Sequence, residues 1–172
     1  MRTLETRYAL ALYELTRDEE GLRSGASLLM DKAELWKALL NPCIPAREKD
    51  GVLCRLLQGR LPQVHLDFFR LLCRRERLAL LPGILTCFHQ LKLEGEGGAV
   101  AVYRCAREPD PQDLDRIGEV LKRRHGLSKV EFQVEVIPEL LGGFTIQIGG
   151  ITYDKSVRGM LGGLRRSLKE RE

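Results

Sequence analysis

The sequence has little that would carry it into or across a membrane. Its longest apolar stretch, residues 78–85, is far shorter than the roughly 20 residues of a membrane-spanning helix and contains Pro82. Residues 1–5 have no apolar core of the kind found in secretory signals, and they carry an early acid, Glu5. We therefore expect no direct membrane insertion, so that any membrane association comes through a partner.

Motifs for catalysis and metal binding are also missing from the sequence. It contains no P-loop, dinucleotide fingerprint, serine-hydrolase elbow or metal-binding histidine pair. Its three histidines, His65, His89 and His125, are isolated from carboxylates and thiols. Cys73 follows His65 by eight residues, which is not a spacing at which helical side chains meet. Nothing speaks positively for an enzyme, and we expect no catalytic residue, metal or cofactor.

The cysteines and the charge indicate the state of the thiols and the kinds of partner that the chain binds. The five cysteines are scattered and odd in number, which favours reduced, intracellular thiols over disulfides or zinc: Cys43, Cys54, Cys73, Cys87 and Cys105. The composition, 44% hydrophobic and 30% charged, suits packed cores with a soluble surface. Acids and bases are interleaved, with a formal net charge of +4, whereas nucleic-acid binders concentrate their cations. We expect no nucleic-acid partner, although an RNA-binding accessory protein remains the main alternative.

Residues 1–94 show helical periodicity throughout. The pattern predicts a bundle of six short helices, near residues 3–17, 19–30, 31–40, 45–59, 62–75 and 78–93. Asp31, with Glu34 three residues later, predicts the cap of the third helix. Residues 95–98 are polar and rich in glycine, which predicts a flexible linker.

Residues 99–172 predict a small α/β domain with a short mixed sheet and a terminal helix, so that the whole chain has the class α + α/β. The expected strands are 99–103, 130–136, 144–148 and 151–153, and the expected helices are 110–125 and 154–170. Apolar and polar residues alternate over 130–136, which predicts a strand with one buried face. Gly149 and Gly150 fit a two-residue hairpin turn.

Two helices of the first half carry more apolar residues than one buried face requires. Residues 8–13 are all apolar or aromatic, and the fifth helix carries seven apolar residues between positions 64 and 73, so that its polar residues Asp67, Arg70 and Arg74 form only a narrow stripe. Both helices can be central in the bundle, which periodicity alone favours, or they can share a groove for a partner's amphipathic helix. The terminal helix has a basic surface, explained either by solvation or by an acidic partner helix.

One set of residues near the end of the chain resembles the signature of a known family, the ATP synthase delta subunits, which include the mitochondrial oligomycin-sensitivity-conferring protein. The set comprises Gly142, Gly143, Gly149, Asp154, Ser156, Val157, Arg158 and Gly159. Weaker similarities lie in residues 7–13, 41–49 and 77–84. The sequence departs from the family pattern at Gly150, where Asp is usual, at Lys155, where Gly is common, and at Arg75–Glu76, where Asn-Gly is frequent.

The resemblance implies a non-catalytic stator connector that makes the catalytic head resist rotor torque, so that proton flow is coupled to ATP synthesis. Residues 1–94 would bind the N-terminal helix of an alpha subunit in a groove of helices one and five, with Tyr8, Ala11, Leu12, Phe69, Leu72 and Cys73 as candidate contacts. Residues 99–172 would bind the b subunits of the peripheral stalk, with Arg158, Arg165 and Lys169 as candidates. The expected location is the cytoplasmic side of a bacterial-type energy-transducing membrane.

Overall fold

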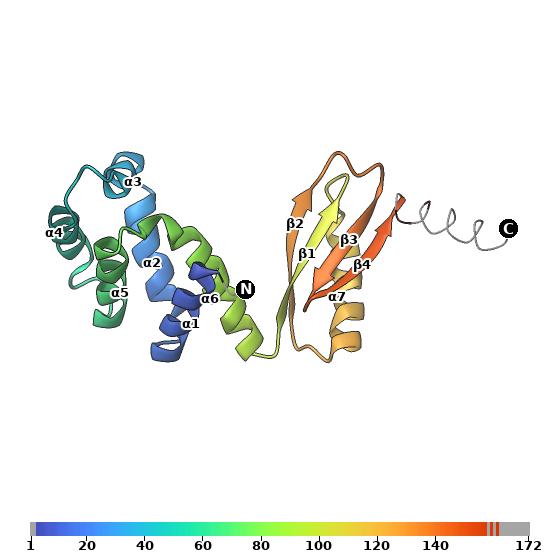
Figure 1. The fold of residues 1–172 in the computed structure, drawn as a ribbon. Coiled ribbons are helices and arrows are strands. Elements are labelled where there is room, and N and C mark those ends of the chain that lie inside the picture. Colours follow the sequence, from blue (N-terminus) through green and yellow to red (C-terminus); the bar gives the residue numbers. More distant parts are fainter. Residues whose placement is uncertain (1–2, 158, 160, 162–172) are drawn as a thin grey trace. The chain divides into compact units, whose positions relative to one another are not determined.

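The computed structural model describes residues 3–157, 159 and 161, and it divides the chain into two compact units, residues 1–92 and 93–172 (Figure 1). The first unit contains α1 (Leu4–Leu15), α2 (Glu19–Met30), α3 (Ala33–Leu40), α4 (Ala46–Leu57), α5 (Gln63–Arg74) and the 3-10 helix η1 (Leu78–Leu80). Helix α6 (Leu81–Gly95) runs across the boundary between the units. The second unit contains β1 (Ala99–Cys105), α7 (Pro111–His125), β2 (Val130–Val136), β3 (Gly143–Ile148) and β4 (Ile151–Ser156).

This content confirms the α + α/β class. Side-chain caps begin α1 and α2, where Thr3 Oγ accepts a hydrogen bond from the Thr6 amide at 3.3 Å and Asp18 Oδ1 accepts one from the Gly21 amide at 3.0 Å. The predicted cap at Asp31 is wrong, because the Asp31 amide donates to the Ser27 carbonyl and so ends α2. Helix α3 begins after Lys32 without a side-chain cap. Over the described residues, no helix is both long and apolar enough to span a bilayer.

The core of the helical unit is formed by side chains from all of its helices. The largest of the fully buried side chains are Phe69, Phe88, Leu12, Leu22, Leu29, Leu53, Leu57, Leu72, Leu81 and Ile84. Tyr13 packs edge-to-face on Phe88, with 5.7 Å between the ring centroids. Helices α1 and α5 both contribute to this core, so part of their apolar excess serves the fold itself.

The second unit is a four-stranded mixed sheet in the order β2-β1-β3-β4, with α7 on one face (Figure 1). Strand β1 pairs parallel with β2 and antiparallel with β3, and β3 pairs antiparallel with β4. Helix α7 approaches β2 closely at Gly118, where a methyl group would lie 3.3 Å from the Phe132 ring. The prediction of one buried face over 130–136 holds only for the first half of β2, because Val134 and Val136 are exposed on this edge strand.

The segment 95–98, for which the sequence predicts a flexible linker, forms the C-terminal cap of α6. Gly95 is the last residue of α6, and Gly97 has the left-handed φ of 77° that glycine accommodates. The amides of Gly97 and Gly98 donate to the carbonyls of Glu94 and Leu93, which is the Schellman arrangement. Ser128 Oγ donates to the Glu96 carbonyl at 2.9 Å. These bonds give the segment a defined conformation.

The signature residues near the end of the chain build the exit from β4. The terminal helix was predicted to begin at Asp154, but Asp154 and Ser156 still belong to β4. Asp154 Oδ1 accepts from the Ser156 amide at 2.8 Å, and Ser156 Oγ accepts from the Gly159 amide at 3.0 Å, as a helix cap does. A side chain on Gly159 would collide with the Asp154 carboxylate. The candidates Arg158, Arg165 and Lys169 lie outside the described residues.

A candidate protein-binding groove between α1 and α5

Helices α1 and α5 enclose an open apolar groove of about 400 Å³. Eight side chains line it: Tyr8, Ala11, Leu12 and Leu15 from α1, and Val64, Asp67, Phe68 and Leu71 from α5. Three of them are unusually exposed for apolar residues, Leu15 at 76%, Leu71 at 44% and Val64 at 42%. We call this feature the α1–α5 groove.

Helical spacing places these side chains on facing surfaces. On α1, Tyr8, Ala11 and Leu15 follow one another at intervals of three and four residues, as Val64, Phe68 and Leu71 do on α5. At the base of the groove, the Tyr8 and Phe68 rings meet edge-to-face with centroids 6.3 Å apart. Arg77 Nη1 donates to the Tyr8 hydroxyl at 2.7 Å and so fixes that ring.

Half of the six candidate contacts line the groove and half do not. Tyr8, Ala11 and Leu12 line it. Phe69, Leu72 and Cys73 do not line it and are buried in the core. On α5 the groove is formed instead by the neighbouring positions Val64, Asp67, Phe68 and Leu71.

The sequence did contain a signal for the correct face of α5. The three residues of the narrow polar stripe, Asp67, Arg70 and Arg74, have different surroundings in the structure. Arg70 donates through Nε and Nη2 to Asp50 of α4 at 2.8 and 3.0 Å, and Arg74 Nη2 lies 3.4 Å from the same carboxylate. The groove-lining residues Val64 and Leu71 lie three residues before and four after Asp67, so Asp67 marks the groove face.

The Asp50 cluster fixes α5 against α4. Hydrogen bonds from Arg70, together with the charges of Arg70 and Arg74, hold the pKa of Asp50 below its usual 3.8, although partial burial opposes the shift. The same contact raises the pKa of Arg70 further. The groove wall formed by α5 therefore rests on a charged, bidentate joint that is present at neutral pH.

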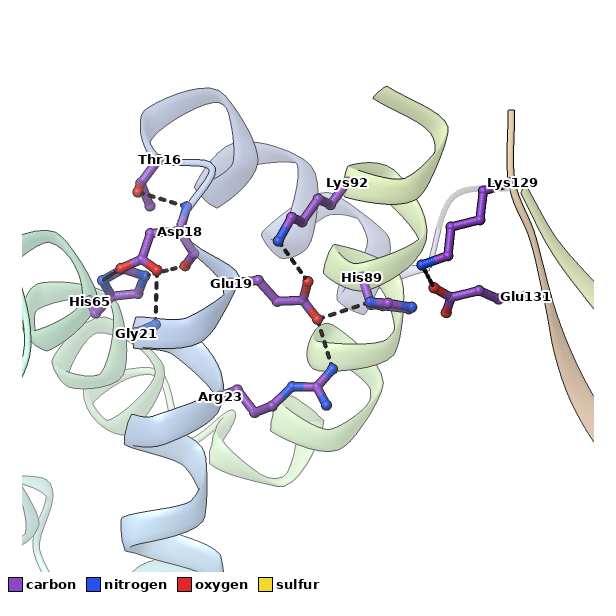
Figure 2. Close-up of polar contacts among 10 residues, drawn as sticks. All are labelled: Thr16, Asp18, Glu19, Gly21, Arg23, His65, His89, Lys92, Lys129 and Glu131. Carbon is purple, nitrogen blue, oxygen red and sulfur yellow. Dashed lines mark hydrogen bonds and ion pairs between the residues drawn. The ribbon is translucent and has the colours of Figure 1, made fainter. Parts of the chain in front are cut away.

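A second polar cluster holds the start of α2 against α5 and α6 (Figure 2). Buried His65 donates from Nε2 to the Asp18 carbonyl at 2.9 Å, and its Nδ1 lies 3.9 Å from Asp18 Oδ2. Glu19 accepts from Arg23 at 2.7 Å and from His89 at 2.9 Å, and Lys92 lies 3.3 Å away. Burial alone would raise the pKa of Glu19, but these donors lower it.

His65 and Cys73, the pair that the sequence places eight residues apart, bond to different backbone carbonyls. His65 bonds to the Asp18 carbonyl, whereas the Cys73 thiol points to the Ala46 carbonyl at 3.8 Å. Burial raises the pKa of Cys73, which makes its reactive thiolate scarcer. Within the described part of the chain, no group of three or more histidine, cysteine, aspartate or glutamate side chains is placed to hold a metal.

The second unit carries another apolar hollow, of about 280 Å³, between α7 and the β3–β4 half of the sheet. Its lining comprises Ile117, Val120, Leu121, Phe144, Ile146 and Tyr153, with Arg116, Arg124 and Lys155 also present. The Arg124 guanidinium lies 5.0 Å from the centroid of the Tyr153 ring. One helix is about as wide as two strands, so α7 leaves this part of the sheet uncovered.

Comparison with known proteins agrees with this architecture over nearly the whole chain. A model of the family described as ATP synthase delta (OSCP) subunit matches residues 4–168. The ATP synthase subunit delta of Methylobacillus flagellatus is 32% identical over 173 residues, which are 97% of each chain. The chloroplastic ATP synthase subunit delta of Emiliania huxleyi is 34% identical over 90% of this chain and 89% of its own.

A solved structure shows the same fold. A chain in the cryo-EM structure of the Toxoplasma gondii mitochondrial ATP synthase hexamer matches with a TM-score of 0.70 at 20% identity, covering 97% of this chain and 98% of that one. The family match, the two relatives and the signature at the exit of β4 lead to one conclusion. This chain belongs to the ATP synthase delta (OSCP) subunit family.

Proposed function

We propose that this chain is a non-catalytic stator connector of an F-type ATP synthase, and that its helical unit holds the N-terminal helix of an alpha subunit in the α1–α5 groove. The observation that carries the proposal is the exposure of Leu15, Val64 and Leu71 along one groove. An amphipathic helix laid into such a groove buries its own apolar face together with these side chains.

The free energy available from such a contact is large enough for a long-lived complex. A fully buried leucine or valine side chain contributes about 1.5–3 kcal/mol, so covering Leu15, Val64 and Leu71 gives several kcal/mol before the partner's own side chains are counted. Nanomolar affinity corresponds to about −12 kcal/mol, and association itself has a large entropic cost. The affinity therefore depends more on how closely the partner helix packs in the groove than on the area that it buries.

We further propose that the second unit binds the b subunits of the peripheral stalk. The apolar hollow beside α7, with Arg116, Arg124 and Lys155 among its lining residues, supports a partner helix with an apolar face and acidic flanks. Arg158, Arg165 and Lys169 remain candidate charge partners in the same unit. A chain that binds head and stalk at once would stop the head from turning with the rotor. Its place would be the cytoplasmic side of a bacterial-type energy-transducing membrane.

Reconstitution tests the stator role. ATP synthase stripped of this subunit in membrane vesicles would receive wild-type chain or the variant Leu71→Glu, and ATP-driven proton pumping would be measured. Wild type should restore pumping and Leu71→Glu should not, because a carboxylate in an apolar groove is costly to desolvate. The matched control is Val52→Glu on α4, a valine that is 39% exposed and does not line the groove. Equal restoration by wild type and Leu71→Glu would refute the proposal.

A further inference from the structure

The α1–α5 groove has one charged residue among the described residues that line it, Asp67. Its side chain is 58% exposed, and it is flanked along α5 by the groove-lining residues Val64 and Leu71. A partner helix that covers the apolar residues on both sides must therefore also cover Asp67. What happens to this carboxylate on binding decides which helices fit the groove.

The surroundings of Asp67 give its carboxylate few hydrogen bonds. Its Oδ1 accepts a hydrogen bond from Gln63 Nε2 at 3.0 Å, but the glutamine amide is uncharged. The neighbouring cation Arg70 lies 3.7 Å away through Nη1, while its Nε and Nη2 are both bonded to Asp50. Arg70 thus forms a long ion pair with Asp67 but donates its hydrogen bonds to Asp50, so that among the described residues no cation donates a hydrogen bond to the Asp67 carboxylate and water solvates its exposed part.

Covering such a carboxylate with an apolar helix would be costly. A carboxylate that loses water without gaining a donor is strongly destabilised, whereas a paired and hydrogen-bonded one is tolerated. We propose that the partner helix carries a lysine or arginine on its groove-facing side and that this cation pairs with Asp67. The inference rests on the proposed function and adds the chemistry by which the groove selects its helix.

The position of Asp67 also fixes where that cation lies in the partner. Since Val64 and Leu71 lie about one helical turn on either side, the cation lies within the apolar stripe of the partner helix, with apolar residues three or four positions before and after it. A charge pair at a single position in an apolar seam also fixes register, because sliding the helix by one turn would leave both charges unpaired. Asp67 is thus a specificity-determining residue of the groove.

A double-mutant cycle tests this pairing. The protein is the full chain, and the probe is a synthetic peptide of about 20 residues from the N-terminus of the alpha subunit of the same organism, long enough for several helical turns. Each lysine or arginine of the peptide is replaced in turn by norleucine, which keeps an unbranched side chain and removes the charge. Every peptide is titrated calorimetrically into wild type and Asp67→Asn, with Glu20→Gln as a matched control that removes an exposed charge outside the groove.

We expect one peptide position at which norleucine weakens binding to wild type at least about tenfold, while the same change has little effect on Asp67→Asn. Asp67→Asn should itself weaken binding of the natural peptide by a similar factor, and Glu20→Gln should not. If every norleucine peptide and Asp67→Asn bind as tightly as the natural pair, or if Asp67→Asn binds more tightly, the pairing is refuted while the groove stands. If the natural peptide does not bind wild type at all, the proposed function falls and this inference falls with it.

Discussion

Replacing Glu76 by glycine should stabilise the helical unit. Glu76 follows the C-terminal end of α5 and has a φ of 56°, the single positive φ among the described residues that are not glycine. Its amide donates to the Cys73 carbonyl at 3.0 Å, and the Arg77 amide donates to the Leu72 carbonyl at 2.8 Å. This is the same Schellman arrangement that Gly97 adopts after α6, but here a glutamate occupies the left-handed position.

The expected gain follows from two opposing terms. A residue with a Cβ in the left-handed region costs about 1–2 kcal/mol. Glycine removes that cost but gives the unfolded chain about 0.5–1 kcal/mol of extra conformational freedom. The net stabilisation from Glu76→Gly is about 0.5–1 kcal/mol, which raises the melting temperature of a unit of this size by about 2–8 °C. No hydrogen bond or ion pair of the Glu76 side chain within the described residues opposes this gain.

Thermal and urea unfolding followed by far-ultraviolet circular dichroism would measure the change. Glu76→Ala is the control, because it removes the same side chain and keeps the Cβ, and it should leave stability nearly unchanged. Gly126→Ala is the mirror experiment in the second unit, since Gly126 ends α7 with a φ of 65° and an added methyl would meet no other atom within 4 Å. It should lose about 1 kcal/mol. Equal stabilities for Glu76→Gly and Glu76→Ala would refute the reasoning.

Three further predictions concern the faces of α5, its joint with α4, and the signature at the end of the chain. Leu72→Ala should cost about 2–5 kcal/mol of stability because Leu72 is fully buried. Leu71→Ala should leave stability nearly unchanged and weaken binding of the alpha-subunit peptide about tenfold. A large loss of stability in Leu71→Ala and a loss of peptide affinity in Leu72→Ala would contradict the assignment of the two faces of α5. The pKa of Asp50 is lowered on folding, so its pairing stabilises the protein above about pH 4 and is lost as the pH falls through the lowered value. Asp50→Asn should thus cost about 1 kcal/mol at neutral pH and progressively less in acid, as urea titrations at several pH values would show. Gly143→Ala should destabilise the second unit by more than about 1 kcal/mol, because Gly143 has a φ of 76° and an added methyl would collide with the Lys155 carbonyl, and it should not change peptide affinity.

Local signals predicted most of the fold well. The periodicity predicted the helices 19–30 and 110–125 and the strand 130–136 within a few residues of the observed ends of α2, α7 and β2. Composition was a weaker guide to the ends of helices. The segment 95–98 has the composition of a flexible linker, but it forms a Schellman cap on Leu93 and Glu94 and accepts a hydrogen bond from Ser128, a contact that no local pattern reveals.

Sequence patterns were also too weak to assign individual side chains to the groove. Periodicity identified α1 and α5 as too apolar for ordinary surface helices, but it could not separate the core face from the groove face of α5. That distinction depends on Asp50 of α4, which binds Arg70 and Arg74 and leaves Asp67 beside Leu71. Glu76 is a different case, because the family's frequent glycine at that point was a direct sign of its left-handed backbone.

The most direct test of the central claim is a calorimetric titration of the full chain with the N-terminal peptide of the alpha subunit from the same organism, at several temperatures. We expect one site with a dissociation constant of about 1 μM or tighter, near −8 kcal/mol, and a negative heat-capacity change that marks apolar burial. Leu71→Glu should abolish this binding and Val52→Glu should not. Absence of heat at every temperature with the peptide at about 100 μM, or equal binding by Leu71→Glu, would contradict binding of the alpha subunit in the α1–α5 groove.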